Sequence, residues 1–284
     1  MKKNKFILSR RALNQIYISY IRPKLEYASI IWDGCSEYCS DSLEKIQNEA
    51  ARIVTGLTRS VSLEKLYQEC GWESLASRRI SQKLCFMYKA THDMVPTYIS
   101  DIMPSTVGDI SSYPLRNRNN INMPVFRTVI SQNSCIPSSI TLWNSLELNL
   151  RTSNSFNIFK DQMRHRISPA KQVPSYYYYG NRYLSVLHAR IRNNCSNLNI
   201  DLFNNHLSQS PYCNSCNVIE DAEHFFFRCN LFTRQRLILF QSTRIFHPLS
   251  IEVILHGVSD FSTDENITIF SAVHKYINQT KRFE

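Results

Sequence analysis

The sequence from residue 41 to residue 56, DSLEKIQNEAARIVTG, repeats apolar residues at the spacing of an α-helix. These residues recur at every third or fourth position, so one face of the helix is apolar and can pack into a core. Asp41 and Glu44 stand three residues apart, as in a capping box at a helix start. Gly56 suits the left-handed backbone that ends a helix. The stretch predicts one amphipathic helix that begins near Asp41 and ends at Gly56.

The same spacing recurs on both sides of this helix. Further helices are expected at residues 13–21, 62–71, 75–93, 137–146, 154–167, 181–197 and 231–240, with two short ones after residue 249. In the helix at 75–93 we expect Ile80, Leu84, Met87 and Tyr88 to face inward and Arg78, Arg79 and Lys83 to face water. The stretch 113–129 lacks a helical period and ends in β-forming residues, which predicts one or two short strands. The predicted fold class is mainly α with a few short strands.

The net charge of +10 is concentrated in one part of the 284-residue chain. Residues 151–244 hold twelve Lys and Arg residues and five Asp and Glu residues, a surplus of seven. A local surplus of this kind suits a polyanion such as RNA or DNA better than a small acidic substrate. A generally basic protein with no such partner is the alternative.

The sequence predicts an intracellular protein, and it leaves nucleus and cytoplasm unresolved. Its apolar runs are much shorter than the roughly 20 residues that span a bilayer, so no membrane partner is expected. The basic start is followed by only three apolar residues, 6–8, before the polar and basic residues 9–11, so it does not resemble a secretion signal. Nine cysteines in such a chain indicate reduced thiols or metal ligands rather than disulfides.

Four residues near the C-terminal end have the spacing of a zinc site. They follow the pattern Cys-x2-Cys-x7-His-x4-Cys and are Cys213, Cys216, His224 and Cys229. Zinc takes four thiolate or imidazole ligands in a tetrahedron, and two cysteines two residues apart reach one ion from a tight turn. The pair alone could be a redox dithiol, but the histidine and third cysteine favour metal. The pattern predicts one structural zinc ion and no other cofactor.

Two groups of basic residues are candidates for nucleic-acid binding. Arg182, His188, Arg190 and Arg192 lie on the helix predicted just before the zinc site and could follow phosphates through charge. Arg116 and Arg118 form a second candidate surface in the irregular stretch. The four consecutive tyrosines at 176–179 could stack on bases, but packing inside the protein is the alternative. We find no catalytic constellation of Ser, His, Asp or Cys residues.

Several stretches in order resemble the C-terminal part of LINE-type (non-LTR, jockey-like) retrotransposon reverse transcriptases. They are YIRPKLEYA at 20–28 with IWD at 31–33, LEKIQNEAARIVTG at 43–56, GWESL at 71–75, LRN at 115–117, LWNSL at 142–146, and the basic helix followed by the zinc ligands. The resemblance runs from about residue 9 to residue 240. It implies a polymerase thumb and connector, followed by a CCHC zinc knuckle.

The resemblance also implies what the chain lacks. These polymerases bind two metal ions with an Asp-Asp pair in the palm, and the sequence contains no Asp-Asp pair. We therefore expect that the chain as it stands is not an enzyme. The implied partners are RNA or DNA and the palm and endonuclease parts of the same element. Preference for RNA or DNA, sequence specificity and oligomeric state are not determined by the sequence.

The predicted organisation follows the order of the chain. A thumb-like helical bundle at 1–105 precedes a connector at 106–167, a linker at 168–175, and a small helical subdomain with the zinc knuckle at 176–284. The predicted function is a non-catalytic, nucleic-acid-binding fragment of a retrotransposon RNA-directed DNA polymerase. The alternatives are a zinc-stabilised protein–protein interaction module and a non-functional remnant of a mobile element.

Overall fold

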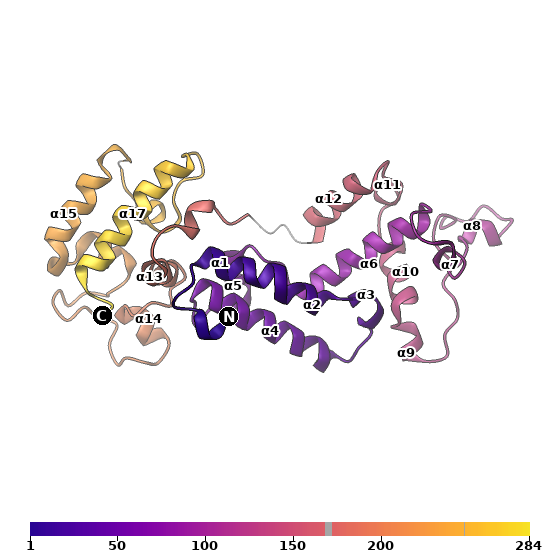
Figure 1. Ribbon diagram of the computed structural model, residues 1–284, viewed down its shortest axis with the longest axis horizontal. Coiled ribbons are helices and arrows are strands. Elements are labelled where there is room, and N and C mark those ends of the chain that lie inside the picture. The colour runs from indigo at the N-terminus through magenta and orange to yellow at the C-terminus, as the bar shows by residue number, and fades with distance from the viewer. Residues whose placement is uncertain (168–171, 247) are drawn as a thin grey trace. The chain divides into compact units, whose positions relative to one another are not determined.

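The computed structural model describes residues 1–167, 172–246 and 248–284. Helices account for 62% of the residues and β-structure for 1%, and the described ranges contain no sheet. Their seventeen α-helices are joined by loops and by short 3-10 and π-helical turns (Figure 1). The mainly α fold class is confirmed. Within these ranges no helix is both long and apolar enough to cross a lipid bilayer.

Two compact units make up the fold, and each combines segments that are far apart in the sequence. Unit 1 contains Met1–Ser19, Asn48–Gly71 and Gln172–Glu284, and unit 2 contains Tyr20–Gln47 and Trp72–Lys171. Segments of the two units therefore alternate along the chain, whereas the domains predicted from the sequence are continuous ranges that follow one another. Within the predicted linker, residues 168–171 lie outside the described part, and a 3-10 turn begins at Ser175.

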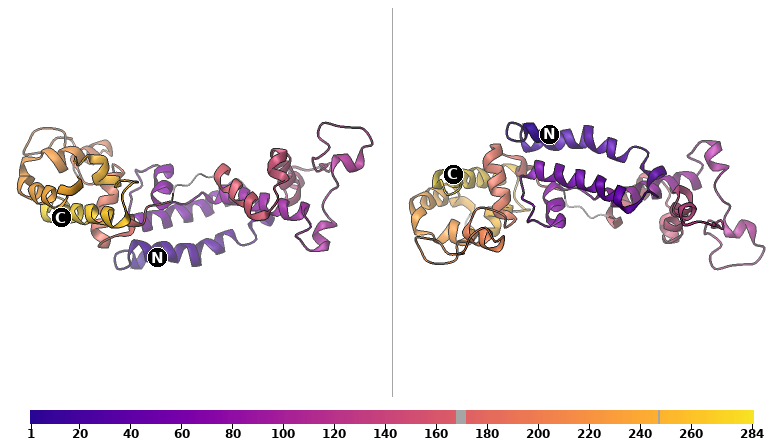
Figure 2. Two further views of the ribbon diagram at one scale, coloured as in Figure 1. Left: turned by 90° about the horizontal axis from the view of Figure 1, so that it is seen from above. Right: turned by 90° about the horizontal axis from the view of Figure 1, so that it is seen from below.

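Unit 1 packs its helices around a core rich in aromatic side chains. Its helices are α1 (Arg10–Ile16), α5 (Leu63–Cys70), α13 (Arg182–Arg192), α14 (Asn199–Asn204), α15 (Thr233–Ser242), α16 (Ile251–His256), α17 (Thr263–Thr280) and the second half of α4 (Glu37–Thr55). Figures 1 and 2 show α17, in yellow, beside α15, in orange, and α17 also packs on α13 and α16. Phe225, Phe226, Phe270 and Tyr276 are buried among them.

Glycines stand at the ends of α4 and α5, and a serine caps the start of α5, at the positions that the sequence predicts. Gly56 ends α4 with φ of 80° and donates its N–H to the carbonyl of Arg52 at 2.8 Å. Ser62 caps the start of α5, and Gly71 ends that helix with φ of 67°. The start of α4 differs from the prediction. The carbonyl of Ser36 already accepts bonds from two N–H groups, so the helix begins at Glu37, one turn before Asp41.

Unit 2 is built around one long helix. Its helices are α2 (Arg22–Glu26), α3 (Ser29–Trp32), α6 (Leu75–Thr91), α7 (Thr97–Ser100), α8 (Val107–Ile110), α9 (Val129–Gln132), α10 (Cys135–Asn144), α11 (Leu148–Arg151), α12 (Phe156–Ile167) and the first half of α4. Helix α6 packs against α3, α10 and α12. Tyr88 of α6 stacks on Phe159 of α12 with ring centroids 4.7 Å apart, and Trp143 of α10 completes this cluster.

The predicted orientation of α6 is only half right. Leu84, Met87 and Tyr88 are buried as expected, but Ile80 is exposed, and Arg79 and Lys83 are only 4% exposed. Both basic side chains pair with Asp33, at 2.6 and 2.5 Å, and so do not face water. A buried cation is tolerated when a carboxylate meets it, and this carboxylate is about fifty residues away in the sequence.

The strands expected in the stretch 113–129 are not present in the described residues. Only an isolated bridge joins Thr106 to Ile121 there. The side-chain amide of Asn144 accepts from the N–H of Ile121 at 3.0 Å and donates to its carbonyl at 2.9 Å. This amide therefore takes the place that the backbone of a neighbouring strand would occupy.

Candidate metal centre

A tight turn positions the first two candidate ligands. The residues just outside it, Tyr212 and Ile219, form an isolated antiparallel bridge. The N–H of Cys213 donates to the carbonyl of Val218 at 2.7 Å, and the N–H of Asn217 donates back to Cys213 at 2.9 Å. Asn217 has φ of 52°, a conformation that asparagine tolerates better than most residues. The two cysteine side chains therefore leave the same side of one turn.

A single π-helical turn, His224–Arg228, positions the other two ligands. Asp221 begins it by accepting the N–H of His224 at 2.7 Å through its carboxylate. The N–H of Cys229 then donates to the carbonyl of His224 at 2.8 Å, an i to i+5 bond. This wider turn accounts for the x4 spacing, because it returns residue 229 to the side of the helix where residue 224 lies.

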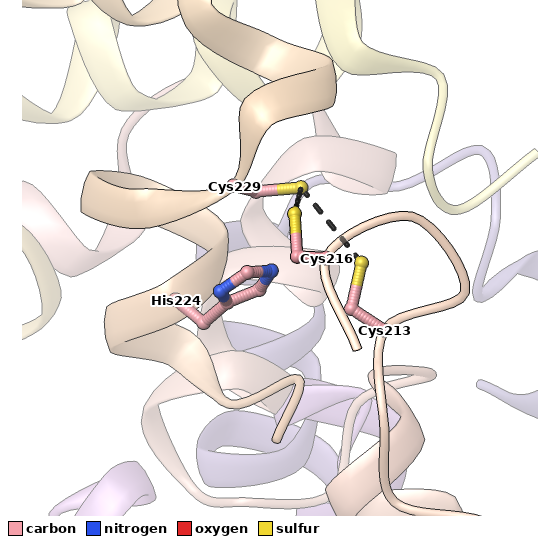
Figure 3. Close-up of side chains that lie close together, drawn as sticks. All are labelled: Cys213, Cys216, His224 and Cys229. Carbon is pink, nitrogen blue, oxygen red and sulfur yellow. Dashed lines mark hydrogen bonds between the residues drawn. The ribbon is translucent and has the colours of Figure 1, made fainter. Parts of the chain in front are cut away.

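The four side chains converge on one point (Figure 3). The Sγ of Cys229 lies 4.0 Å from the Sγ of Cys213 and 3.9 Å from that of Cys216. One ligand atom from each of the four residues lies within 4.8 Å of the others. A tetrahedral zinc ion about 2.3 Å from each sulfur would hold the sulfurs about 3.8 Å apart. The spacing fits one metal ion, and all three thiols are free of disulfides.

The surroundings of His224 also fit a metal ligand. Both ring nitrogens are buried, and neither has a hydrogen-bond partner among the described residues. Burial lowers the pKa of His224, which favours the neutral imidazole that binds metal. Burial raises the pKa of Cys229 to about 12, so this thiolate depends on a neighbouring cation. The residues thus have the composition and the unmet bonding capacity of a Cys3His metal site.

The candidate site is part of the core of unit 1. Phe225 and Phe226, within the π-turn, are fully buried, and the hydroxyl of Tyr276 donates to the carbonyl of Phe225 at 2.5 Å. Arg236 of α15 donates to the carbonyls of Phe226 and Cys229. The aromatic side chains of the π-turn are therefore part of a larger core, which includes residues of α15 and α17.

Helix α13 does not present its predicted basic face to solvent. His188 and Arg192 are 1% and 9% exposed, so the expectation that they lie on an outer surface is wrong. Arg182 donates to the carbonyls of Lys5, Ile53 and Val54, and Arg190 donates to that of Gly56. These side chains hold α13 to the end of α4, because a guanidinium can satisfy carbonyls that a helix end leaves unpaired.

Glu69 is the centre of a buried charge cluster that the sequence patterns do not indicate. Its carboxylate accepts from Arg10 at 2.8 Å, from Arg192 at 2.8 and 3.1 Å, and from Asn193 at 3.1 Å. Arg192 also lies over the ring of Tyr177, 3.8 Å from its centroid. No local signal could have revealed this cluster, because Arg10 and Arg192 are 59 and 123 residues away from Glu69.

His188 belongs to a buried pair of imidazoles in the same unit. Its Nδ1 lies 3.3 Å from Nε2 of His274, and its Nε2 lies 2.9 Å from the carbonyl of Ile254. Burial, helped by the charge of Arg192, lowers the pKa of His274 to about 4 and that of His188 well below its usual range. Both rings are therefore neutral structural groups near neutral pH.

The remaining predicted residues divide into exposed and packed ones. Arg116 and Arg118 are exposed, so their prediction as a binding surface stays open. The four tyrosines at 176–179 are buried or half-buried, in agreement with the packing alternative. The hydroxyl of Tyr176 donates to the carbonyl of His256 at 3.0 Å.

No protein-family model matches the sequence, and no curated protein or solved structure is significantly similar to it.

Proposed function

We propose that this protein is a zinc-stabilised, non-catalytic nucleic-acid-binding segment of the kind that follows the palm in LINE-type reverse transcriptases. The proposal rests on the order of the resembling stretches, on the geometry of the Cys3His site and on the distribution of exposed positive charge. The zinc ion would be structural, because four protein ligands leave no position open for a substrate.

The observation that carries nucleic-acid binding is a groove of about 660 Å³ within unit 2, lined by residues of α6 and α12. Its five basic residues are Arg22, Arg78, Lys89, Lys160 and Arg164, and its two acidic residues are Glu73 and Asp161. A concave surface with one dominant sign of charge attracts the phosphates of a nucleic-acid strand.

The cations on α12 are the best placed to contact phosphates. Lys160 and Arg164 are exposed, stand one helical turn apart, and form no ion pair with any residue in the described ranges. Arg78, in contrast, is already paired with Glu26, with one N–O distance of 3.1 Å. Lys89 lies over the ring of Phe156 at 4.7 Å, and this half-buried ring is an aromatic surface in the groove on which a base can stack.

Replacing Lys160 and Arg164 together with alanine is expected to weaken binding of a single-stranded oligonucleotide by about tenfold at low salt. The slope of log K against log salt should flatten by about 0.7 for each phosphate that the variant no longer neutralises. Fluorescence anisotropy of a labelled oligonucleotide at several salt concentrations measures both quantities. The matched control replaces Arg11 and Lys275, which are exposed in unit 1, with alanine. Equal slopes for the two double variants would remove the groove from the binding surface.

A protein-binding role is the second candidate, and one observation favours it. An apolar groove of about 660 Å³ lies between α3, α6, α7 and α10, and its lining includes Ile31 and Ile102, which are 71% and 60% exposed. Apolar surface of this kind often marks a protein contact. Salt separates the two roles, because an apolar contact does not weaken as salt rises whereas a phosphate contact does.

A further inference from the structure

Unit 1 contains a cavity that neither the metal site nor the nucleic-acid groove includes. It has a volume of about 530 Å³ and lies between the N-terminal segment, the end of α4 and the start of α13. This volume is within the range of about 300–1,000 Å³ that is typical of small-ligand sites. Its lining combines a cationic part and an apolar part.

The cationic part has little negative charge to balance it. The basic residues of the lining are Lys5, Arg52, Arg59, Arg182 and Arg190, and the one acidic residue is Glu49. Glu49 lies 3.9 Å from Arg59, whose side chain is 87% exposed. Burial, reinforced by the charges of Arg10 and Arg190, lowers the pKa of Arg182 to about 10. The excess of five basic residues over one acidic residue gives the cavity a positive potential that an anion would relieve.

Two of these arginines retain hydrogen-bond donors for such an anion. The side chain of Arg52 lines the cavity, and within the described ranges it donates no hydrogen bond and forms no ion pair. The Nε of Arg190 donates to the carbonyl of Gly56 at 2.8 Å, so the terminal amino groups of Arg190 remain to donate to an anion. Arg182 differs, because its three nitrogens all donate to backbone carbonyls. The remaining donors of the Arg52 and Arg190 guanidinium groups can bind an anion in the cavity.

The apolar part of the lining indicates that the anion carries an apolar or aromatic group. Ile53, Leu57, Val186 and Leu187 contribute aliphatic surface. Two aromatic residues of the lining are incompletely covered: Phe6 is 80% exposed and Tyr183 is 50% exposed. A simple inorganic anion would leave this surface in water, whereas a planar base would cover it.

We propose that this cavity binds a single nucleotide, with the phosphate at Arg52 and Arg190 and the base against the apolar lining. Guanidinium groups match the oxygens of a phosphate in charge and in geometry. The proposal goes beyond binding of a nucleic-acid strand, because the cavity and the groove lined by α6 and α12 belong to different units and share no residue.

Calorimetric titration of the full chain with AMP tests the proposal, with adenosine and inorganic phosphate as separate titrants. We expect one AMP to bind per chain. Adenosine and phosphate should each bind at least about tenfold more weakly, because each offers half of the recognised chemistry. Arg52→Gln should weaken AMP binding by about tenfold, the effect typical of removing a charge-assisted hydrogen bond. Arg52→Lys, which keeps the positive charge, should retain part of the AMP affinity that Arg52→Gln loses.

The controls separate this site from the rest of the chain. Arg11→Gln removes the same charge from an exposed position of unit 1 and should leave AMP binding unchanged. Lys160→Ala with Arg164→Ala should reduce oligonucleotide binding and leave AMP binding unchanged, so failure of either proposal is seen by itself. Absence of AMP binding, equal affinity for AMP and phosphate, or equal loss in Arg52→Gln and Arg11→Gln would each overturn the proposal. Binding to vesicles of phosphatidic acid without binding to AMP would also overturn it.

Discussion

Replacing Cys216 with serine is expected to remove most of the bound zinc and to unfold the region near residues 205–240. A serine hydroxyl keeps its proton near neutral pH and is a poor substitute for a thiolate. Without the metal, the two buried ring nitrogens of His224 have no partner among the described residues, and this cost destabilises the turns that hold the ligands. Elemental analysis measures the zinc content, and hydrogen exchange of the backbone amides measures the local loss of structure.

Cys216 is the informative ligand because it is half-buried, whereas Cys213 and Cys229 are buried. The substitution therefore tests coordination with little disturbance of the core. Cys39→Ser is the matched control, since Cys39 is an exposed free thiol in unit 2. An unchanged zinc content in Cys216→Ser would contradict the assignment of the site. Loss of zinc without loss of amide protection would limit the metal to a minor structural role.

Glu69→Gln is expected to destabilise unit 1 by about 3–5 kcal/mol, the usual cost of breaking a buried ion pair from one side. The variant keeps the size of the side chain but leaves Arg10 and Arg192 buried without a counter-charge. Thermal unfolding followed by circular dichroism should show a midpoint lower by on the order of 10 °C. Glu64→Gln is the matched control, because Glu64 lies on the same helix and is exposed.

The pH dependence of stability gives a second measurement of the same cluster. Burial alone would raise the pKa of Glu69, but the charges of Arg192 and Arg10 outweigh burial and lower it to about 2. A depressed pKa means that the carboxylate stabilises the fold fully above its unfolded pKa of about 4.5, and that this contribution is lost as pH falls toward 2. The stability difference between wild type and Glu69→Gln should therefore shrink below about pH 4.5. A constant difference across this range would contradict the role assigned to the ionised carboxylate.

The metal ligands could be predicted from the sequence because all four lie within 17 residues, Cys213 to Cys229. One tight turn and one helical turn bring them together, and both turns depend on local backbone geometry. The helix ends at Gly56 and Gly71 are local in the same sense, since each needs only a backbone that glycine adopts easily. The π-helical form of the turn at His224 does not follow from the sequence pattern, although the x4 spacing is consistent with it.

The expected exposure of His188 and Arg192 on α13 was wrong for the opposite reason. An amphipathic pattern shows which face of a helix is apolar, but it does not show whether the polar face meets water or another segment. Arg192 meets Glu69 of α5, and Arg182 meets carbonyls at the end of α4, both more than a hundred residues away. The excess of basic residues around the cavity lined by Arg52 and Arg190 could not be predicted from the sequence either. These residues come together only when α4 and α13 meet in the folded chain.

The sequence by itself therefore determined the mainly α fold class, most helix positions and the convergence of the candidate zinc ligands, which all depend on interactions between near neighbours. Only the tertiary structure decided which charged side chains are buried, how segments from both ends of the chain combine into unit 1, and where unpaired cations gather. The physical reason is that a charge is stabilised either by water or by a partner group. The partner of a buried charge can lie anywhere in the sequence.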